Sequence, residues 1–215
     1  MRILALDGSL ARASAALWAD GEVLAHRAVA GDRVQPTALP PMAEALLRAG
    51  AAPDAVAVVV GPGSFTGLRS AIALAEGIAL GLGIPVIGVT TGEALAAALP
   101  EALREGAETW AVVDTRRGRM ALERIAPGGL VAAPPELYAE AELPAPSGPV
   151  ALAGDAAPLA AARLLARGFD AVLTDSRLPD AGAAARVAAL RLAGAIPPLG
   201  SAPLYAEPPA VRLPR

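Results

Sequence analysis

The stretch Val58-Val-Val-Gly-Pro-Gly-Ser-Phe-Thr-Gly-Leu-Arg69 joins an apolar, β-branched run to a helical one through a glycine-rich turn. The run 55–60 is typical of a buried strand, and residues 66–82 predict a helix that ends at Gly83. A buried strand followed directly by a helix is characteristic of a sheet covered by helices. We therefore expect an α/β fold around this turn.

The residues on either side of the stretch extend this pattern. Asp20-Gly21 between two strand-like runs predicts a hairpin, and Pro40-Pro41 fit only the first turn of a helix, which we expect to start near them. The predicted elements of the first half are strands 3–6, 14–19 and 22–29, a helix to residue 49, strand 55–60, helix 66–82, strand 84–89 and helix 91–99.

The second half repeats this order of elements without repeating the residues. We expect strands 109–113, 119–125, 130–133, 150–153 and 171–174, with helices 157–166 and 180–193, the last capped by Asp180. Residues 141–149 read as a Pro-rich surface connection. The order resembles the duplicated actin-like fold of actin, hexokinase and Hsp70, in which two lobes each carry a mixed sheet flanked by helices. We expect lobes at 1–100 and 101–195, joined near residues 100–108, and an irregular Pro-rich tail at 196–215.

The composition narrows the class of protein. The chain is 54% hydrophobic and 18% charged, as in a folded globular protein. It has no cysteine, which excludes disulfides and thiolate metal sites. Residues 71–83 are apolar, but this segment is shorter than a membrane-spanning helix requires. No signal peptide is recognisable, so we expect a cytoplasmic protein. A net charge of −3 disfavours a protein that binds nucleic acid without the help of a partner.

Asp7-Gly8-Ser9 follows the first strand, where the superfamily places a phosphate loop. One interpretation is an Asp beside a metal-bound nucleotide, and the other is a turn whose side chain binds its own backbone. We favour the turn. The matching segment of the second lobe, Asp114-Thr115-Arg116, lacks small residues after Asp and places a bulky Arg where a phosphate would need backbone amides.

Residues 61–67 also allow two interpretations, an anion site at a helix N-terminus or a structural turn. No Lys-Ser/Thr follows at P-loop spacing. We favour glycines that supply unusual backbone angles, with Ser64 or Thr66 as the helix cap.

The helix 66–82 has almost no polar face. Its outward positions are mostly small or apolar, and Ala73, Gly77 and Gly81 recur every four residues, which permits close approach of another helix. Either the neighbouring helix to residue 49 covers this face, or both helices form an intermolecular seam. The expected outward residues are Arg69, Ala73, Glu76, Gly77 and Leu80.

Catalytic groups are not evident. His26 is the single histidine, so no zinc or iron pair such as HExxH can form, and a lone mid-strand His is more often structural. The carboxylates are scattered, and no pair is placed convincingly for acid–base chemistry.

Three segments together resemble the TsaB (YeaZ) family: Ile3-Leu-Ala-Leu-Asp-Gly-Ser9, the quoted stretch 58–69, and Ile84-Pro-Val-Ile-Gly-Val89. Weaker landmarks follow at Val113-Asp-Thr-Arg116 and Pro203-Leu-Tyr205. The family motif comprises Gly61, Pro62, Gly63, Ser64, Phe65, Thr66, Gly67, Leu68 and Arg69. Gln35-Pro36 stands where members often have His-Ser, and Ala206-Glu207 where many have Leu-Arg.

The resemblance implies a non-catalytic dimerisation subunit, with an actin-like fold, of the bacterial machinery that makes N6-threonylcarbamoyladenosine in tRNA. Implied partners are the catalytic TsaD subunit, the ATPase TsaE, a second copy when alone, and tRNA only through the complex, with no membrane. No cofactor is implied, and a nucleotide is expected only at the interface with partners. The implied pairing surface comprises Met42, Ala45, Leu46, Arg69, Ala73, Glu76, Gly77 and Leu80.

Two other functions stay open from the residues. An actin-like ATP-dependent enzyme, a kinase or glycopeptidase-like protein, would bind magnesium-ATP tightly. A direct RNA-binding module would shift RNA by itself, although the acidic charge disfavours it.

Overall fold

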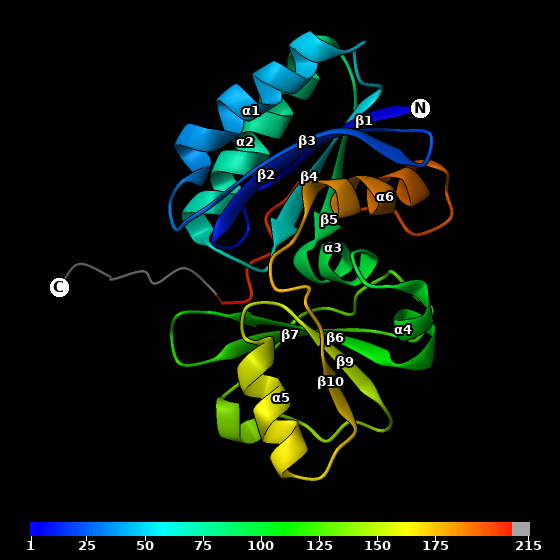
Figure 1. Ribbon diagram of the computed structural model, residues 1–215. Helices are drawn as coiled ribbons and strands as arrows, with labels where there is room; N and C mark the ends of the chain where they lie inside the picture. The colour runs from blue at the N-terminus through cyan, green and yellow to red at the C-terminus, as the bar shows by residue number, and fades with distance from the viewer. Residues whose placement is uncertain (208–215) are drawn as a thin grey trace, which may run out of the picture.

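The structure, a computed structural model, describes residues 1–207. It contains two five-stranded sheets, one in the upper lobe and one in the lower lobe of Figure 1. In each sheet an antiparallel three-stranded meander continues into two parallel strands. The strand orders, β3-β2-β1-β4-β5 and β8-β7-β6-β9-β10, therefore match, and the duplicated actin-like fold is confirmed. The strands are β1 (Arg2–Asp7), β2 (Arg12–Ala19), β3 (Glu22–Ala30), β4 (Ala55–Gly61), β5 (Val86–Thr90), β6 (Glu108–Asp114), β7 (Met120–Ile125), β8 (Glu136–Tyr138), β9 (Val150–Ala153) and β10 (Ala171–Leu173).

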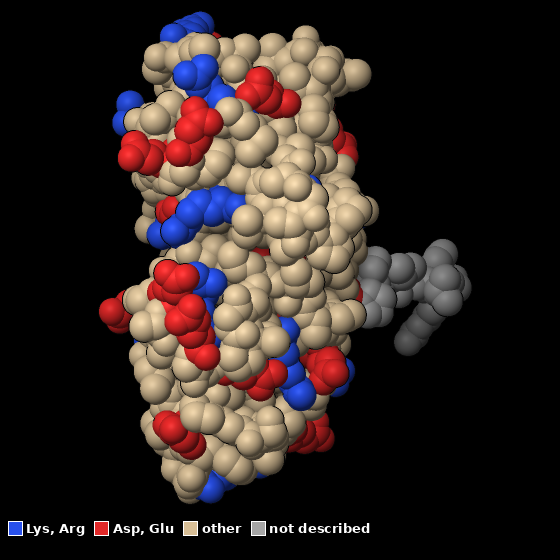
Figure 2. Space-filling view, turned by 90° about the vertical axis from the view of Figure 1, so that its right-hand side faces the viewer, with Lys and Arg blue, Asp and Glu red and all other residues tan. Residues whose placement is uncertain are grey.

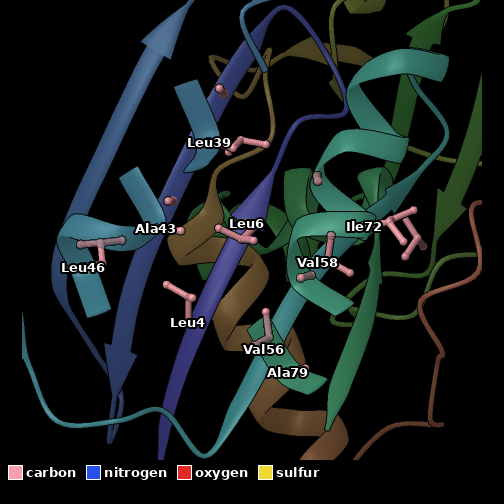
Figure 3. Packing of buried hydrophobic residues seen from close by; sticks show 14 of the residues in the cluster. Leu4, Leu6, Leu39, Ala43, Leu46, Val56, Val58, Ile72 and Ala79 are labelled. Atoms are coloured by element: carbon pink, nitrogen blue, oxygen red, sulfur yellow. The ribbon is translucent and has the colours of Figure 1, made fainter. Parts of the chain in front are cut away.

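The centre of the first sheet is buried on both faces. Every residue of β4 is buried, as expected for a continuous apolar run in a parallel strand pair. Alternation along β1 sends Leu4 and Leu6 to one face and Ile3 and Ala5 to the other. Figure 3 shows the first face, where Leu4 and Leu6 lie beside Val56 and Val58 under residues from two helices.

Helices α1 (Gln35–Ala49) and α2 (Phe65–Leu82) cover that face, while α3 (Thr91–Ala97) and α6 (Ala181–Leu192) cover the other (Figure 1). The placement of α6 corrects the prediction that residues 180–193 belong to the second lobe. Its buried alanines let it lie close against Trp18 and Val59, and Ala181 N donates to the buried Ser14 Oγ at 3.1 Å. Asp180 caps it as predicted, since its side chain accepts from Gly182 N.

Helix α1 begins earlier than predicted, at Gln35, and contains Pro40 and Pro41. Tertiary contacts hold its first turn in place. The Gln35 side chain donates Nε2 to the Leu10 carbonyl at 2.7 Å, and Leu39 is buried in the core. Each proline inside a helix removes one backbone hydrogen bond, which disfavours a helix through Pro40 and Pro41. The contacts of Gln35 and Leu39 outweigh this cost.

Three further segments differ from the prediction. Residues 130–133 do not form a full strand: Ala132 makes one isolated bridge to Ile125, and the third strand of the meander is β8. The linker between lobes contains a short helix, α4 (Glu101–Gly106), which Pro100 directly precedes. The third difference is a short 3-10 helix (Glu140–Glu142) at the start of the Pro-rich connection. Helix α5 (Ala157–Ala166), by contrast, lies where it was predicted.

The described part of the predicted tail, residues 196–207, is irregular but firmly attached. Leu199 O accepts from Gly88 N at 2.8 Å, and Leu204 N donates to Val60 O at 2.7 Å. Leu199 and Leu204 also pack against the first core cluster. Residues 208–215 of the predicted tail lie outside the described residues.

Candidate functional site: the glycine-rich turn, the interlobe cleft and the helix pair

The glycine-rich turn is held against the first loop by direct contact between backbones. A Cβ on Gly63 would lie 2.3 Å from Ser9 O, and a Cβ on Gly67 would lie 2.1 Å from Gly8 O. Ser64 N donates to Ser9 O at 2.7 Å, and the Ser64 side chain caps α2 by accepting from Gly67 N. The glycines therefore permit close packing of the two loops, and of the two predicted caps, Ser64 and Thr66, it is Ser64 that caps the helix.

Phe65 and Arg69 of the motif meet Tyr205 from the C-terminal segment. The rings of Phe65 and Tyr205 stack with centroids 5.4 Å apart, and the Arg69 guanidinium lies 3.7 Å from the centre of the Phe65 ring. Arg69 Nε also donates to Tyr205 Oη at 2.8 Å. Two landmarks that are far apart in the sequence thus form one cluster at the start of α2.

Asp7 is fully buried and turned toward its own loop. Its Oδ1 accepts hydrogen bonds from Ser9 N at 2.9 Å and Ser9 Oγ at 2.7 Å. Burial raises the pKa of Asp7 to about 6, while the bonds from Ser9 oppose that rise. Its second oxygen, Oδ2, has no hydrogen-bond partner among the described residues. This geometry matches the turn interpretation.

The corresponding loop of the second lobe is also closed on itself. Asp114 Oδ1 accepts from Arg116 N at 2.8 Å, and Arg116 has a left-handed φ of 60°. The Arg116 guanidinium lies 3.6 Å from carboxylate oxygens of both Asp114 and Asp155. Its charge is thus balanced within the protein.

A cavity of about 690 Å³ lies between the two loops. Its walls come from both lobes and from the C-terminal segment, and include Ser64, Phe65, Arg116, Asp155 and Tyr205. The amides of Ser9, Ser64 and Arg116 all donate inside the protein, so they are not free to cradle a phosphate in this conformation. The cleft has the size of a ligand site, but these three amides are not available to a ligand in it.

The outward face of α2 is uncovered. Each predicted outward residue, Arg69, Ala73, Glu76, Gly77 and Leu80, is exposed, and Leu80 reaches 86%. A Cβ on Gly77 or Gly81 would meet nothing within 4 Å. Helix α1 therefore does not cover this face, although the two helices lie side by side on the sheet (Figure 1).

Helix α2 is also longer than the apolar segment recognised in the sequence. With 18 residues it is, within the described part of the chain, the one helix long and apolar enough to cross a membrane. That test alone is weak, because core helices also pass it, and the inward residues Leu68, Ala71, Ala75 and Ala79 pack on the sheet. Only 33% of the helix is buried within the molecule.

The α1 residues of the predicted pairing surface divide into two groups. Ala45 is exposed and Met42 is half-buried at the edge of the core. Leu46 is only 2% exposed and packs in the core, so its assignment to an accessible pairing surface is corrected. The helical period alone did not distinguish the inward Leu46 from its outward neighbours.

One buried ionic cluster at the lobe junction was missed. Glu93, at the start of α3, forms a two-point ion pair with Arg191 of α6 at 2.6 and 2.7 Å. Glu123 of β7 lies beside it, fully buried, and accepts from Gly92 N at 2.7 Å. Burial raises the pKa of Glu123 to about 8, and the charge of Glu93 adds to the rise, against hydrogen bonds from Thr90 and Gly92. The only local sequence feature that pointed to this cluster was Glu93, which stands at the third position of α3, where a Glu commonly completes a helix cap.

His26 contributes to packing between elements. Its Nε2 lies 2.8 Å from Asp180 Oδ2, which links β3 to the cap of α6. Across residues 1–207, no group of three or more His, Cys, Asp or Glu side chains is arranged to hold a metal ion.

Comparisons with known proteins agree with the predicted resemblance. The family model described as TsaD, tRNA N6-adenosine threonylcarbamoyltransferase, matches residues 29–133. The tRNA threonylcarbamoyladenosine biosynthesis protein TsaB of Escherichia coli K12 is 43% identical over 94 residues, or 42% of this chain and 41% of that protein. TsaB of Haemophilus influenzae is 33% identical over 128 residues, or 58% of this chain and 54% of the relative.

The matched region thus spans about half or less of the curated relatives. The likeness in structure extends further. YeaZ from Pseudomonas aeruginosa superposes with a TM-score of 0.79 and 28% identity over 95% of this chain and 99% of that one. Together these matches confirm the predicted resemblance to the TsaB (YeaZ) family.

Proposed function

We propose that this chain is a non-catalytic subunit of the machinery that makes N6-threonylcarbamoyladenosine in tRNA, and that it docks a TsaD-type catalytic subunit through α1 and α2. On this proposal the protein works in the cytoplasm and binds no cofactor of its own. It reaches tRNA only within the complex, which a TsaE-type ATPase also joins.

The biosynthetic pathway is supported by the names of the relatives. The two curated relatives named above are tRNA threonylcarbamoyladenosine biosynthesis proteins, and the TsaD family model covers α1, α2 and the turn between β4 and α2.

The outward face of α2 carries the docking proposal. Leu80 is 86% exposed, Leu82 is 46% exposed, and the backbone between them is open at Gly81. Leaving such a face in water forgoes about 25 cal/mol for each Å² of apolar surface. Ala73, Gly77 and Gly81 lie every four residues and give a partner helix room to approach closely. A second helix seated there would bury this face.

Co-purification with a TsaD-type subunit tests the proposal. We expect Gly77→Leu to abolish the complex, because the new side chain fills the space that the partner needs while meeting nothing within this chain. Leu80→Arg should weaken binding at least tenfold by placing a charge in the interface. Leu165→Arg on α5 is the matched control, since Leu165 is 55% exposed on the other lobe.

Glu76→Arg should also disrupt the complex. Because Glu76 Oε1 accepts from Ser201 Oγ at 2.8 Å, Ser201→Ala serves as its control for loss of that internal bond. Complexes that survive both Gly77→Leu and Leu80→Arg would contradict the docking surface. A homodimer that dissociates in the same variants would show that the isolated chain pairs through the same face.

The alternative of an ATP-dependent enzyme is tested on the same protein. We expect no tight magnesium-dependent ATP binding by the isolated chain, because the loop amides at the cleft are already bonded. Tight binding in a calorimetric titration would favour the enzyme.

A further inference from the structure

A second cavity lies on the other side of the first sheet from α1 and α2. It has a volume of about 380 Å³ and is bounded by the hairpin of β2 and β3, the end of α3, helix α4 and helix α6. This volume is within the range of about 300–1,000 Å³ that is usual for small-molecule sites. Figure 2 shows the side of the molecule that carries α4, where basic side chains lie at mid-height beside uncharged surface.

Two arginines at this cavity have no acidic partner among residues 1–207. Arg104 comes from α4, and its Nε is buried without a hydrogen-bond partner in the described residues. Arg186 comes from α6 and donates Nη2 to the Ala97 carbonyl at 2.6 Å, so a neutral group holds it in place. Other arginines of the described residues pair with carboxylates, as Arg191 does with Glu93. No carboxylate of the described residues therefore neutralises either guanidinium group.

The remaining walls are apolar, with one further donor. Leu130 and Leu190 line the cavity together with Trp18, whose side chain is 7% exposed. Trp18 Nε1 has no hydrogen-bond partner among the described residues, and a buried donor without a partner is unfavourable. The lining combines an aromatic wall, two leucines and two cations.

We propose that this cavity binds a small amphipathic anion, with a carboxylate or phosphate head at Arg104 and Arg186 and an apolar body against Trp18, Leu130 and Leu190. Guanidinium groups match planar carboxylate and phosphate oxygens in pairs. A few charged groups on a mostly apolar lining are the usual composition of a ligand site. The site is separate from the α1–α2 face, because the first sheet lies between them.

The two tryptophans make binding directly visible by NMR. The ¹⁵N-labelled full chain has two indole N–H signals, from Trp18 and Trp110, and Trp110→Phe assigns them. Trp110 is 1% exposed and donates Nε1 to Glu108 Oε2 at 2.7 Å, so it acts as an internal reference. Titration with 4-phenylbutyrate and with hexyl phosphate should shift the Trp18 signal and leave the Trp110 signal in place. The neutral analogue 4-phenylbutanol should bind at least tenfold more weakly.

Variants distinguish this site from general apolar adsorption. Arg104→Gln and Arg186→Gln should each weaken binding of the anionic probe about tenfold or more, as expected for a charge-assisted hydrogen bond. Arg27→Gln, an exposed arginine on β3 outside the cavity, should have no effect. Ala189→Phe should block the cavity, and thermal melting checks that each variant is folded.

The proposal is overturned if neither anion shifts the Trp18 signal at millimolar concentration. It is also overturned if the neutral probe binds as tightly as the anions, or if both arginine variants bind like the parent. Complex formation with a TsaD-type subunit is measured in the same variants, so the docking proposal stands or falls independently.

Discussion

The backbone at Gly63 passes so close to Ser9 that a Cβ atom on Gly63 would lie 2.3 Å from the Ser9 carbonyl oxygen. The same oxygen accepts a hydrogen bond from Ser64 N at 2.7 Å. The two loops that lead out of β1 and β4 are therefore joined at a point where only glycine fits. This contact sets the position from which α2 departs.

Replacing Gly63 tests that contact. We expect Gly63→Ala to destabilise the isolated chain by about 1–3 kcal/mol, because the clash is with backbone that cannot move independently. Urea unfolding followed by circular dichroism measures the change. An alanine variant as stable as the parent would show that the loops can separate without cost.

Gly77→Ala should have the opposite effect on the isolated chain. Gly77 lies in the middle of α2 with open space around its Cβ position, so alanine gains helix propensity without a clash. We expect stabilisation of about 0.5–1 kcal/mol in the same assay. A loss of stability would mean that the outward face of α2 is covered even in the isolated chain.

The ion pair between Glu93 and Arg191 should be costly to break. Both side chains are almost fully buried, so Arg191→Met leaves an unpaired carboxylate inside the protein. We expect a loss of about 3–5 kcal/mol in urea unfolding. Arg48→Ala, which breaks the exposed pair with Glu44 on α1, should cost less than about 0.5 kcal/mol and is the control.

Glu123 should make stability depend on pH. Burial raises the pKa of Glu123 from 4.5 to about 8, so between these values the folded chain keeps a proton that the unfolded chain has lost. The contribution to stability is complete below pH 4.5 and decreases as pH rises toward 8.

Glu123→Gln removes the titrating group and keeps a neutral side chain of similar shape. We expect its unfolding free energy to fall less steeply than that of the parent across this range. Parallel curves of stability against pH for the two proteins would contradict a proton held at Glu123.

Tyr205→Ala should loosen the C-terminal segment locally. The variant loses the stack on Phe65 and the hydrogen bond from Arg69, which hold Tyr205 to the start of α2. We expect faster hydrogen exchange at Leu204 N, which donates to Val60 O, with little change in exchange at the centre of β4. Unchanged exchange at Leu204 would show that the backbone bond holds the segment by itself.

Local sequence signals predicted most elements correctly. The continuous apolar run of β4, the Ser64 cap of α2 and the runs that became β9 and α5 each depend on contacts within a few residues. Errors arose where distant contacts outweighed local preference. The Leu10 carbonyl holds Gln35 and the core holds Leu39, so α1 begins before the two prolines near which the sequence predicted its start.

The candidate sites were only partly visible in the sequence. Helical periodicity predicted the outward face of α2, since Ala73, Gly77 and Leu80 project together from any helix over these residues. Whether α1 covers that face was left open by the sequence. The pairing of Phe65 with Tyr205 and the cavity beside Trp18 join segments separated by most of the chain. No local pattern encodes such contacts.

The sequence by itself determined the order of strands and helices in the first lobe, the glycine-rich turn and the apolar character of α2, because these depend on backbone preference and on the periodicity of side chains. Only the tertiary structure decided that α6 returns to the first sheet and that Glu93, Glu123 and Arg191 share one buried site. It also decided which face of α2 stays open to solvent. The physical reason is that burial is a property of the whole folded chain: a residue is covered only when a segment distant in sequence packs against it.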